Sequence, residues 1–147
     1  MESCCALRVD TRPTPSHCPE CGRPGRDVER ITLKALHCPE PLMRLSAPKH
    51  RFCSTPECPV VYFGHGEVFG RGDLTVPVFQ KEPAGARTVC YCFAITEREI
   101  QQELAVNGRS TASDRVTQLV KASRCACEVR NPQGSCCLGN LATVTRG

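Results

Sequence analysis

The chain has 147 residues, of which 31 are Leu, Ile, Val or Phe, 13 are Cys and none is Trp. This apolar content lies near the limit at which a hydrophobic core alone stabilises a small domain, so we expect disulfides or bound metal to contribute. The formal net charge of +4 is spread evenly over both halves, without a basic helix or stripe, which argues against a nucleic-acid partner.

The first residues contain no apolar run typical of a secretory signal, and no stretch approaches the length that spans a membrane. We therefore expect a cytoplasmic protein without membrane insertion. In a reducing compartment, closely spaced cysteines are metal ligands more often than disulfide partners. Bound metal is thus the expected source of the missing stability.

Residues 1–16 are polar, contain Pro and show no periodicity, so we expect a flexible tail. Cys4 and Cys5 lie in this tail. Thiolates favour soft ions such as Cu(I), and a thiol pair on a mobile segment would suit one. An unstructured tail that happens to contain cysteines explains the pair equally well.

Residues 17–84 combine short apolar runs, Gly and Pro with two cysteine pairs, and we expect a small β-rich domain. Cys18 and Cys21 form a C-x₂-C knuckle, and Cys53 and Cys58 form the second pair. Two such pairs are typical of a closed four-thiolate zinc site, because each short loop presents two sulfurs to one tetrahedral ion. Zn²⁺ is the expected cofactor of this domain.

Three other residues remain alternatives as ligands of this site, namely Cys38, His17 and His37. The Val- and Phe-rich stretches 59–63 and 67–79 follow the second cysteine pair directly. Their composition predicts a β-hairpin packed behind the zinc.

A domain boundary is expected within Phe79–Arg87, whose Pro, Gly and small or charged residues are typical of a linker. We place the boundary after residue 84, so that residues 85–147 form the second domain. There the apolar pattern changes from strand-like to helical. The expected fold class is therefore α+β, with a small β-rich zinc-binding domain followed by a helical domain.

Three helices are expected in the second domain. Thr96 and Glu99 form a capping box at the start of the first helix, and Asn107-Gly108 is a typical helix end. Apolar residues at spacings of three and four predict a second helix at about 113–122 and a third from about Cys136.

A second set of cysteines brackets these helices. Cys90 and Cys92 form a C-x-C pair just before the first helix, where free N–H groups and the positive end of the helix dipole would stabilise thiolates. Four further thiols follow the second helix, namely Cys125, Cys127, Cys136 and Cys137. This layout is typical of an iron–sulfur cluster held on a helical hairpin.

The motifs "CYCFAIT" and "CEVRNPQGSCCLGN" resemble the bacterioferritin-associated ferredoxin-like (BFD-like) [2Fe–2S] domain. In chain order, the motifs "CPEC", "FCSTPECPVVYF", "CYC" and "NPQGSCC" together make residues 17–142 resemble the amino-terminal zinc plus [2Fe–2S] domain of the CopZ copper chaperone family. This resemblance implies that Zn²⁺ is bound by Cys18, Cys21, Cys53 and Cys58. It implies that a [2Fe–2S] cluster is bound by Cys90, Cys92, Cys127 and Cys137.

Two choices within the cluster ligands stay open at this point. Cys137 is preferred over the adjacent Cys136. Cys125 replaces Cys127 if the register shifts by two residues.

The resemblance implies a redox or electron-transfer accessory protein in copper or related soft-metal handling, which reduces Cu(II) to Cu(I) for a partner. The expected partners are a copper or soft-metal chaperone or transporter and an electron donor protein. The 147 residues contain no M-x-C-x-x-C loop, so direct copper delivery by that loop is not expected. The alternative is a non-catalytic metal-binding adaptor or a cluster-based redox sensor.

Enzyme motifs are scarce in this sequence. It contains no Gly-rich nucleotide loop and no H-E-x-x-H motif. We therefore expect at most an electron carrier or metal reductase without a classical active site.

Overall fold

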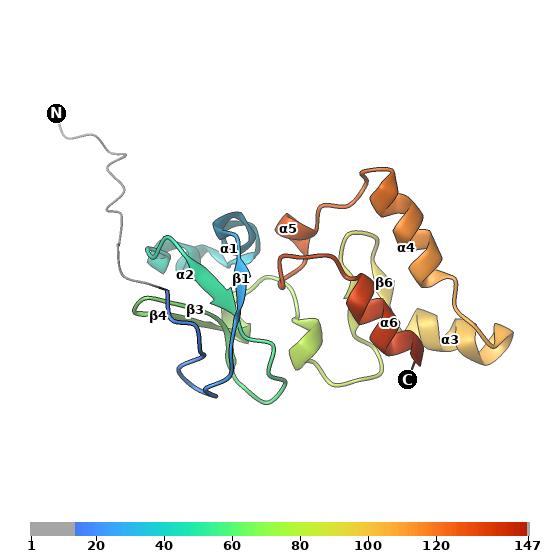
Figure 1. The fold of residues 1–147 in the computed structure, drawn as a ribbon, viewed down its shortest axis with the longest axis horizontal. Coiled ribbons are helices and arrows are strands. Elements are labelled where there is room, and N and C mark those ends of the chain that lie inside the picture. The colour runs from blue at the N-terminus through green and yellow to red at the C-terminus, as the bar shows by residue number, and fades with distance from the viewer. Residues whose placement is uncertain (1–13, 147) are drawn as a thin grey trace.

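The computed structural model describes residues 14–146, so most of the tail predicted over residues 1–16 lies outside the described residues. Figure 1 shows a first half built around a β-sheet beside a second half built mainly of helices. In the described chain, the elements of the first half are β1 (Arg26–Val28), α1 (Arg30–Leu36), α2 (Pro39–Arg44), β2 (His50–Phe52), β3 (Val60–Gly64), β4 (Glu67–Gly70) and the 3₁₀ turn η1 (Arg71–Asp73).

The four strands of the first half form one antiparallel sheet in the order β1-β2-β3-β4. Strand β3 is the buried centre of this sheet. Because successive side chains of a strand point to opposite faces, Tyr62 packs with Leu33 of α1, whereas Phe63 packs with the cysteines of the first half. These four residues, called here the first set, are Cys18, Cys21, Cys53 and Cys58. The sheet therefore carries a helix-covered core on one face and a cysteine cluster on the other.

The predicted hairpin is present as β3 and β4, although its second strand ends at Gly70, well before Phe79. The chain turns there because the Asp73 carboxylate accepts a hydrogen bond from the Gly70 N–H at 2.8 Å. Helices α1 and α2 were not expected in a β-rich domain. They span only seven and six residues, so their apolar spacing is too short to establish a helical period.

The second half contains, among the described residues, the 3₁₀ turn η2 (Phe79–Lys81), β5 (Thr88–Cys90), β6 (Ile95–Thr96), α3 (Glu97–Asn107), α4 (Ala112–Lys121), α5 (Cys127–Arg130) and α6 (Leu138–Arg146). The three predicted helices are confirmed as α3, α4 and α6. The Thr96 hydroxyl accepts a hydrogen bond from the Glu99 N–H at 3.3 Å, and Gly108 ends α3 with a left-handed φ of 73°. Both ends of α3 are thus set by local sequence.

The segment Phe79–Arg87, whose composition predicted a linker, contains buried residues. Phe79 is 6% exposed and belongs to the core of the second half, where the Arg87 guanidinium lies 4.1 Å from its ring centroid. Lys81 is 5% exposed. Burial of an aromatic ring and a lysine holds this segment between the two halves.

A direct interface joins the halves. Helix α1 contacts α5, and these helices lie side by side in Figure 1. The Tyr62 hydroxyl donates a hydrogen bond to the Pro132 carbonyl oxygen. Gly134 lies so close to β1 and α1 that a Cβ atom on it would approach Val28 Cγ2 to 2.9 Å.

Gly134→Ala is expected to lower the free energy of unfolding by about 1–3 kcal/mol, because its φ of +72° and the contact with Val28 leave no room for a methyl group. Gly139→Ala in α6 is the matched control. Apart from its chain neighbours and the backbone of its own helix, no atom lies within 4 Å of its added Cβ, so this change should raise stability by about 0.5–1 kcal/mol. Urea denaturation compares the two variants, and equal effects would contradict the close approach of the halves.

Candidate metal centres

The first set of cysteines forms a compact group. Its four sulfur atoms all lie within 4.8 Å of one another, with Cys18 and Cys58 at 3.8 Å and Cys21 and Cys53 at 3.7 Å. Cys21 is partly exposed and the other three are buried. Mutual distances of this kind suit one tetrahedral ion bound by four thiolates. The structure thus brings together all four residues predicted for the zinc site.

Backbone hydrogen bonds shape both loops of this group. In the first loop the Cys18 N–H donates to the Arg23 carbonyl at 2.8 Å, and Gly22 turns the chain with a φ of 73°. In the second loop the Cys53 N–H donates to the Val61 carbonyl at 2.8 Å, which attaches the loop to β3. The short C-x₂-C spacing therefore forms a knuckle because a residue with left-handed φ follows it.

Cys18, Cys21 and Cys58 differ in their tendency to ionise. A hydrogen bond with the Thr55 hydroxyl at 3.4 Å, followed by the backbone N–H of Arg23, lowers the pKa of Cys21 to about 6. Burial raises the pKa of Cys58 to about 12 and also raises the pKa of Cys18. A bound cation would therefore favour the thiolate forms of Cys18 and Cys58, which matches a structural zinc site.

The alternative ligands lie outside this group. Cys38 precedes α2, and its N–H donates to the Asp73 carbonyl at 2.9 Å. His17 lies 2.8 Å from the Ser16 hydroxyl. His37 is buried against the rings of Tyr62 and Phe69, and its Nδ1 donates to a backbone carbonyl of α1. None of the three belongs to the four-sulfur group.

Lys81 is a residue at this site that the sequence did not reveal. Its ammonium group donates to the carbonyl oxygens of Thr55 at 2.7 Å and Cys58 at 2.9 Å, and it lies 3.9 Å from the Cys53 sulfur. Lys81 follows Cys53 by 28 residues, in a segment whose composition indicated a linker. No local pattern could have placed it here.

The second set of cysteines forms two sulfur pairs. Cys92 Sγ lies 3.6 Å from Cys127 Sγ, and Cys90 and Cys137 are buried in the same core cluster, where each thiol shifts the pKa of the other. Cys137 is 1% exposed, whereas the adjacent Cys136 is exposed. The structure thus brings Cys127 and Cys137, rather than their neighbours, against the C-x-C pair.

The C-x-C pair does not lie at a helix start, which corrects one expectation. Cys90 ends β5, and β6 intervenes before α3 begins at Glu97. The hairpin supplies the N–H groups instead, because the strand pairing of β5 with β6 turns the chain between them. Across the site, the Ala126 N–H donates to Cys92 Sγ at 3.2 Å.

The thiols of the second set are also polarised. A hydrogen bond with Cys137, supported by the backbone N–H groups of Phe93 and Cys92, lowers the pKa of Cys90 to about 6. Burial and the neighbouring Cys92 raise the pKa of Cys127 to about 12. The hydrogen bond with Cys90, together with burial, raises the pKa of Cys137 well above its usual range. Positive charge at this site would favour the thiolate forms of Cys127 and Cys137.

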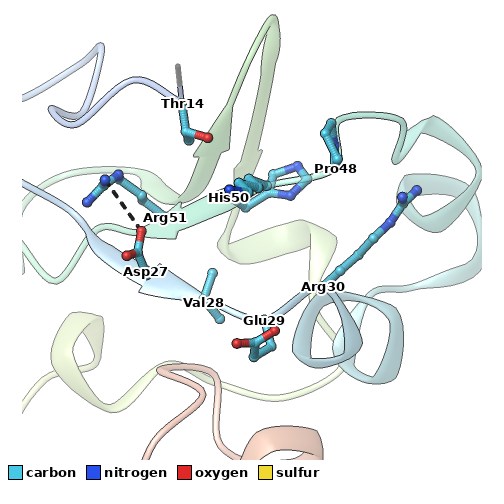
Figure 2. A pocket seen from close by; sticks show the side chains of 9 residues that line it. Thr14, Asp27, Val28, Glu29, Arg30, Pro48, His50 and Arg51 are labelled. Carbon is cyan, nitrogen blue, oxygen red and sulfur yellow. Dashed lines mark ion pairs between the residues drawn. The ribbon is translucent and has the colours of Figure 1, made fainter. Parts of the chain in front are cut away.

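A cavity of about 520 Å³ lies between β1, β2 and the start of α1 (Figure 2). Its lining contains no cysteine, and the Arg51 guanidinium pairs with Asp27 at 3.4 Å beside it. His50 also lines it, but the ring is 2% exposed and its Nε2 is 2.7 Å from a Glu67 carboxylate oxygen. The chemistry of this cavity differs from that of the thiol sites.

Within residues 14–146, no helix combines the length and the apolar character needed to cross a bilayer.

Residues 15–75 match a family described as a zinc binding domain, of the CopZ type. The copper chaperone CopZ of Archaeoglobus fulgidus is 36% identical over 124 residues, which cover 84% of this chain and 59% of that protein. The chain therefore spans less than two thirds of that relative. The X-ray structure of the Archaeoglobus fulgidus CopZ N-terminal domain superposes with a TM-score of 0.72 at 30% identity, covering 87% of this chain and 96% of that one.

Cys58→Ser is expected to release zinc and to loosen the first half, because a hydroxyl replaces one of four thiolates around the ion. Zinc content after dialysis against a chelator measures this effect. Cys38→Ser is the matched control, since its thiol lies outside the four-sulfur group, and it should retain about one zinc per chain. Full zinc retention by Cys58→Ser would show that this ligand set is wrong.

Proposed function

The chain belongs to the family of the CopZ amino-terminal domain, with a CopZ-type zinc-binding domain in its first half, and we propose that it is a redox accessory protein in copper or related soft-metal handling. In this proposal Cys18, Cys21, Cys53 and Cys58 bind Zn²⁺, and Cys90, Cys92, Cys127 and Cys137 bind a BFD-like [2Fe–2S] cluster. The protein reduces Cu(II) to Cu(I) for a partner.

The division of the second cysteine set into two pairs is the observation that carries this proposal. A mononuclear zinc site needs four sulfurs around one point, as in the first set, whereas a [2Fe–2S] cluster takes two thiolates at each of two irons. Over the described residues, only the first set brings all its ligand atoms within 4.8 Å of one another. Paired sulfurs thus favour a two-iron cluster over a second zinc.

The residues around the pairs suit a redox centre. Hydrogen bonds to the sulfurs raise the potential of such centres by stabilising their more negative, reduced form. The Ala126 N–H donates such a bond to Cys92, and backbone N–H groups of Phe93 and Cys92 face Cys90. Cys90 and Cys137 are buried, whereas Cys92 is partly exposed. Electron exchange with a partner is therefore expected on the Cys92 side.

A [2Fe–2S] cluster supplies one electron at a time when bound, so one Cu(II) substrate ion gains one electron to become Cu(I), and an electron donor protein restores that electron. Zinc has no redox chemistry and stabilises the first half. The relative named above is described as a copper chaperone, which favours a copper chaperone or transporter as the recipient. In a cytoplasmic location the thiols would stay reduced and able to bind metal.

Cys92→Ser is expected to abolish visible cluster absorption and Cu(II) reduction by the chemically reduced protein, while about one zinc per chain remains. Cys125→Ser is the control, because Cys127 rather than Cys125 meets Cys92 in the structure. Both variants are purified without oxygen and assayed with a Cu(I)-specific chromophore. An unchanged spectrum in Cys92→Ser, or its loss in Cys125→Ser, would contradict the proposed ligand set.

A further inference from the structure

Lys81 is a buried lysine with a fully used ammonium group. Lysines are almost never buried unless their charge is paired or hydrogen-bonded. The three N–H donors of the ammonium match its three contacts, which are the carbonyl oxygens of Thr55 and Cys58 and the sulfur of Cys53. Its side chain thus reaches from η2, in the second half, back into the first set of cysteines.

These contacts act on the metal site in two ways. Four thiolates around Zn²⁺ leave a net charge of about −2, and an ammonium group beside Cys53 offsets part of it. Thr55 and Cys58 belong to the loop that carries the second cysteine pair, so the same ammonium also closes this loop. Groups that hold and polarise metal ligands in this manner commonly change metal affinity by large factors.

The other two residues of η2 contact the second half. Phe79 packs in its core, and the Phe79 N–H donates to the Tyr91 hydroxyl oxygen at 3.0 Å. The Gln80 side-chain amide donates to the Gln133 side-chain oxygen at 2.5 Å, and the Gln133 side-chain amide donates to the Cys136 carbonyl oxygen at 2.9 Å. Three successive residues therefore connect the first cysteine set to the loop before Cys137.

We propose that η2 is a clasp between the two cysteine sets, in which Lys81 is a positioning residue that retains zinc and Gln80 orders the loop at residues 133–137. Zinc at the first set thereby supports the geometry of the second set. The identity of the second centre rests on the proposed function, whereas the effect of Lys81 on zinc does not.

The rate of zinc release to a chromogenic chelator tests the Lys81 end of the clasp, using the full chain loaded with zinc. Lys81→Met should release zinc about 10- to 100-fold faster than the unaltered protein, as expected for loss of a group that supports metal ligands. Lys34→Met is the matched control, because Lys34 is exposed on α1, and it should leave the rate unchanged. Equal rates for Lys81→Met and the unaltered protein would overturn the proposal.

Two further variants separate charge from folding. Lys81→Arg keeps the cation and should retain zinc better than Lys81→Gln, which keeps polar contacts with the two carbonyls but lacks the charge. This comparison remains informative if Lys81→Met fails to fold. Equal zinc release by the Arg and Gln variants would overturn the role of the charge.

Hydrogen–deuterium exchange tests the Gln80 end. Gln80→Ala should release zinc at the unaltered rate but show faster amide exchange over residues 133–137. Unchanged exchange there would overturn the link between the two cysteine sets.

Rapid zinc release by Lys81→Met from a protein that contains no iron or sulfide would support the clasp and reject the proposed redox function. An intact [2Fe–2S] cluster in the unaltered protein, together with zinc release by Lys81→Met at the unaltered rate, would support the redox function and reject the clasp.

Discussion

Four sulfur atoms from two loops lie within 4.8 Å of one another on one face of the sheet, and the architecture of the first half depends on this contact. The sheet is short, with strands of three to five residues, and the opposite face is covered by two short helices. In the proposed zinc-bound protein, a shared ion replaces apolar area that such a domain cannot bury. Burial raises the pKa of Cys18 and Cys58, so a bound cation would favour their thiolate forms and couple metal binding to folding at this point.

The second half uses thiols differently, and the two halves are not independent. Its sulfurs form pairs, and Cys90 and Cys137 belong to the core of this half. The interface through Tyr62, Pro132 and Gly134 fixes the loop that leads to Cys137 against the first half. A redox centre benefits from such rigidity, because small changes in hydrogen bonding and exposure at the sulfurs alter its potential.

Features with short-range causes were predictable from sequence, and features with long-range causes were not. The ends of α3 follow from Thr96 and Gly108, and the C-x₂-C knuckle is a pattern within four residues. The position of Lys81 depends on a contact with Cys53, 28 residues earlier in the chain. The pairing of Cys90 with Cys137 depends on which of the two adjacent cysteines before α6 faces the core. Helix α1 was missed because three buried residues, Thr32, Leu33 and Leu36, do not establish a period.

The content of zinc, iron and acid-labile sulfide in protein purified without oxygen tests most directly whether the two cysteine sets hold different centres. About one zinc, two irons and two sulfides per chain are expected, together with visible absorption. Zinc without iron, sulfide or colour would contradict a redox role. The second set would then be a thiol or zinc site, and the protein a metal-binding adaptor.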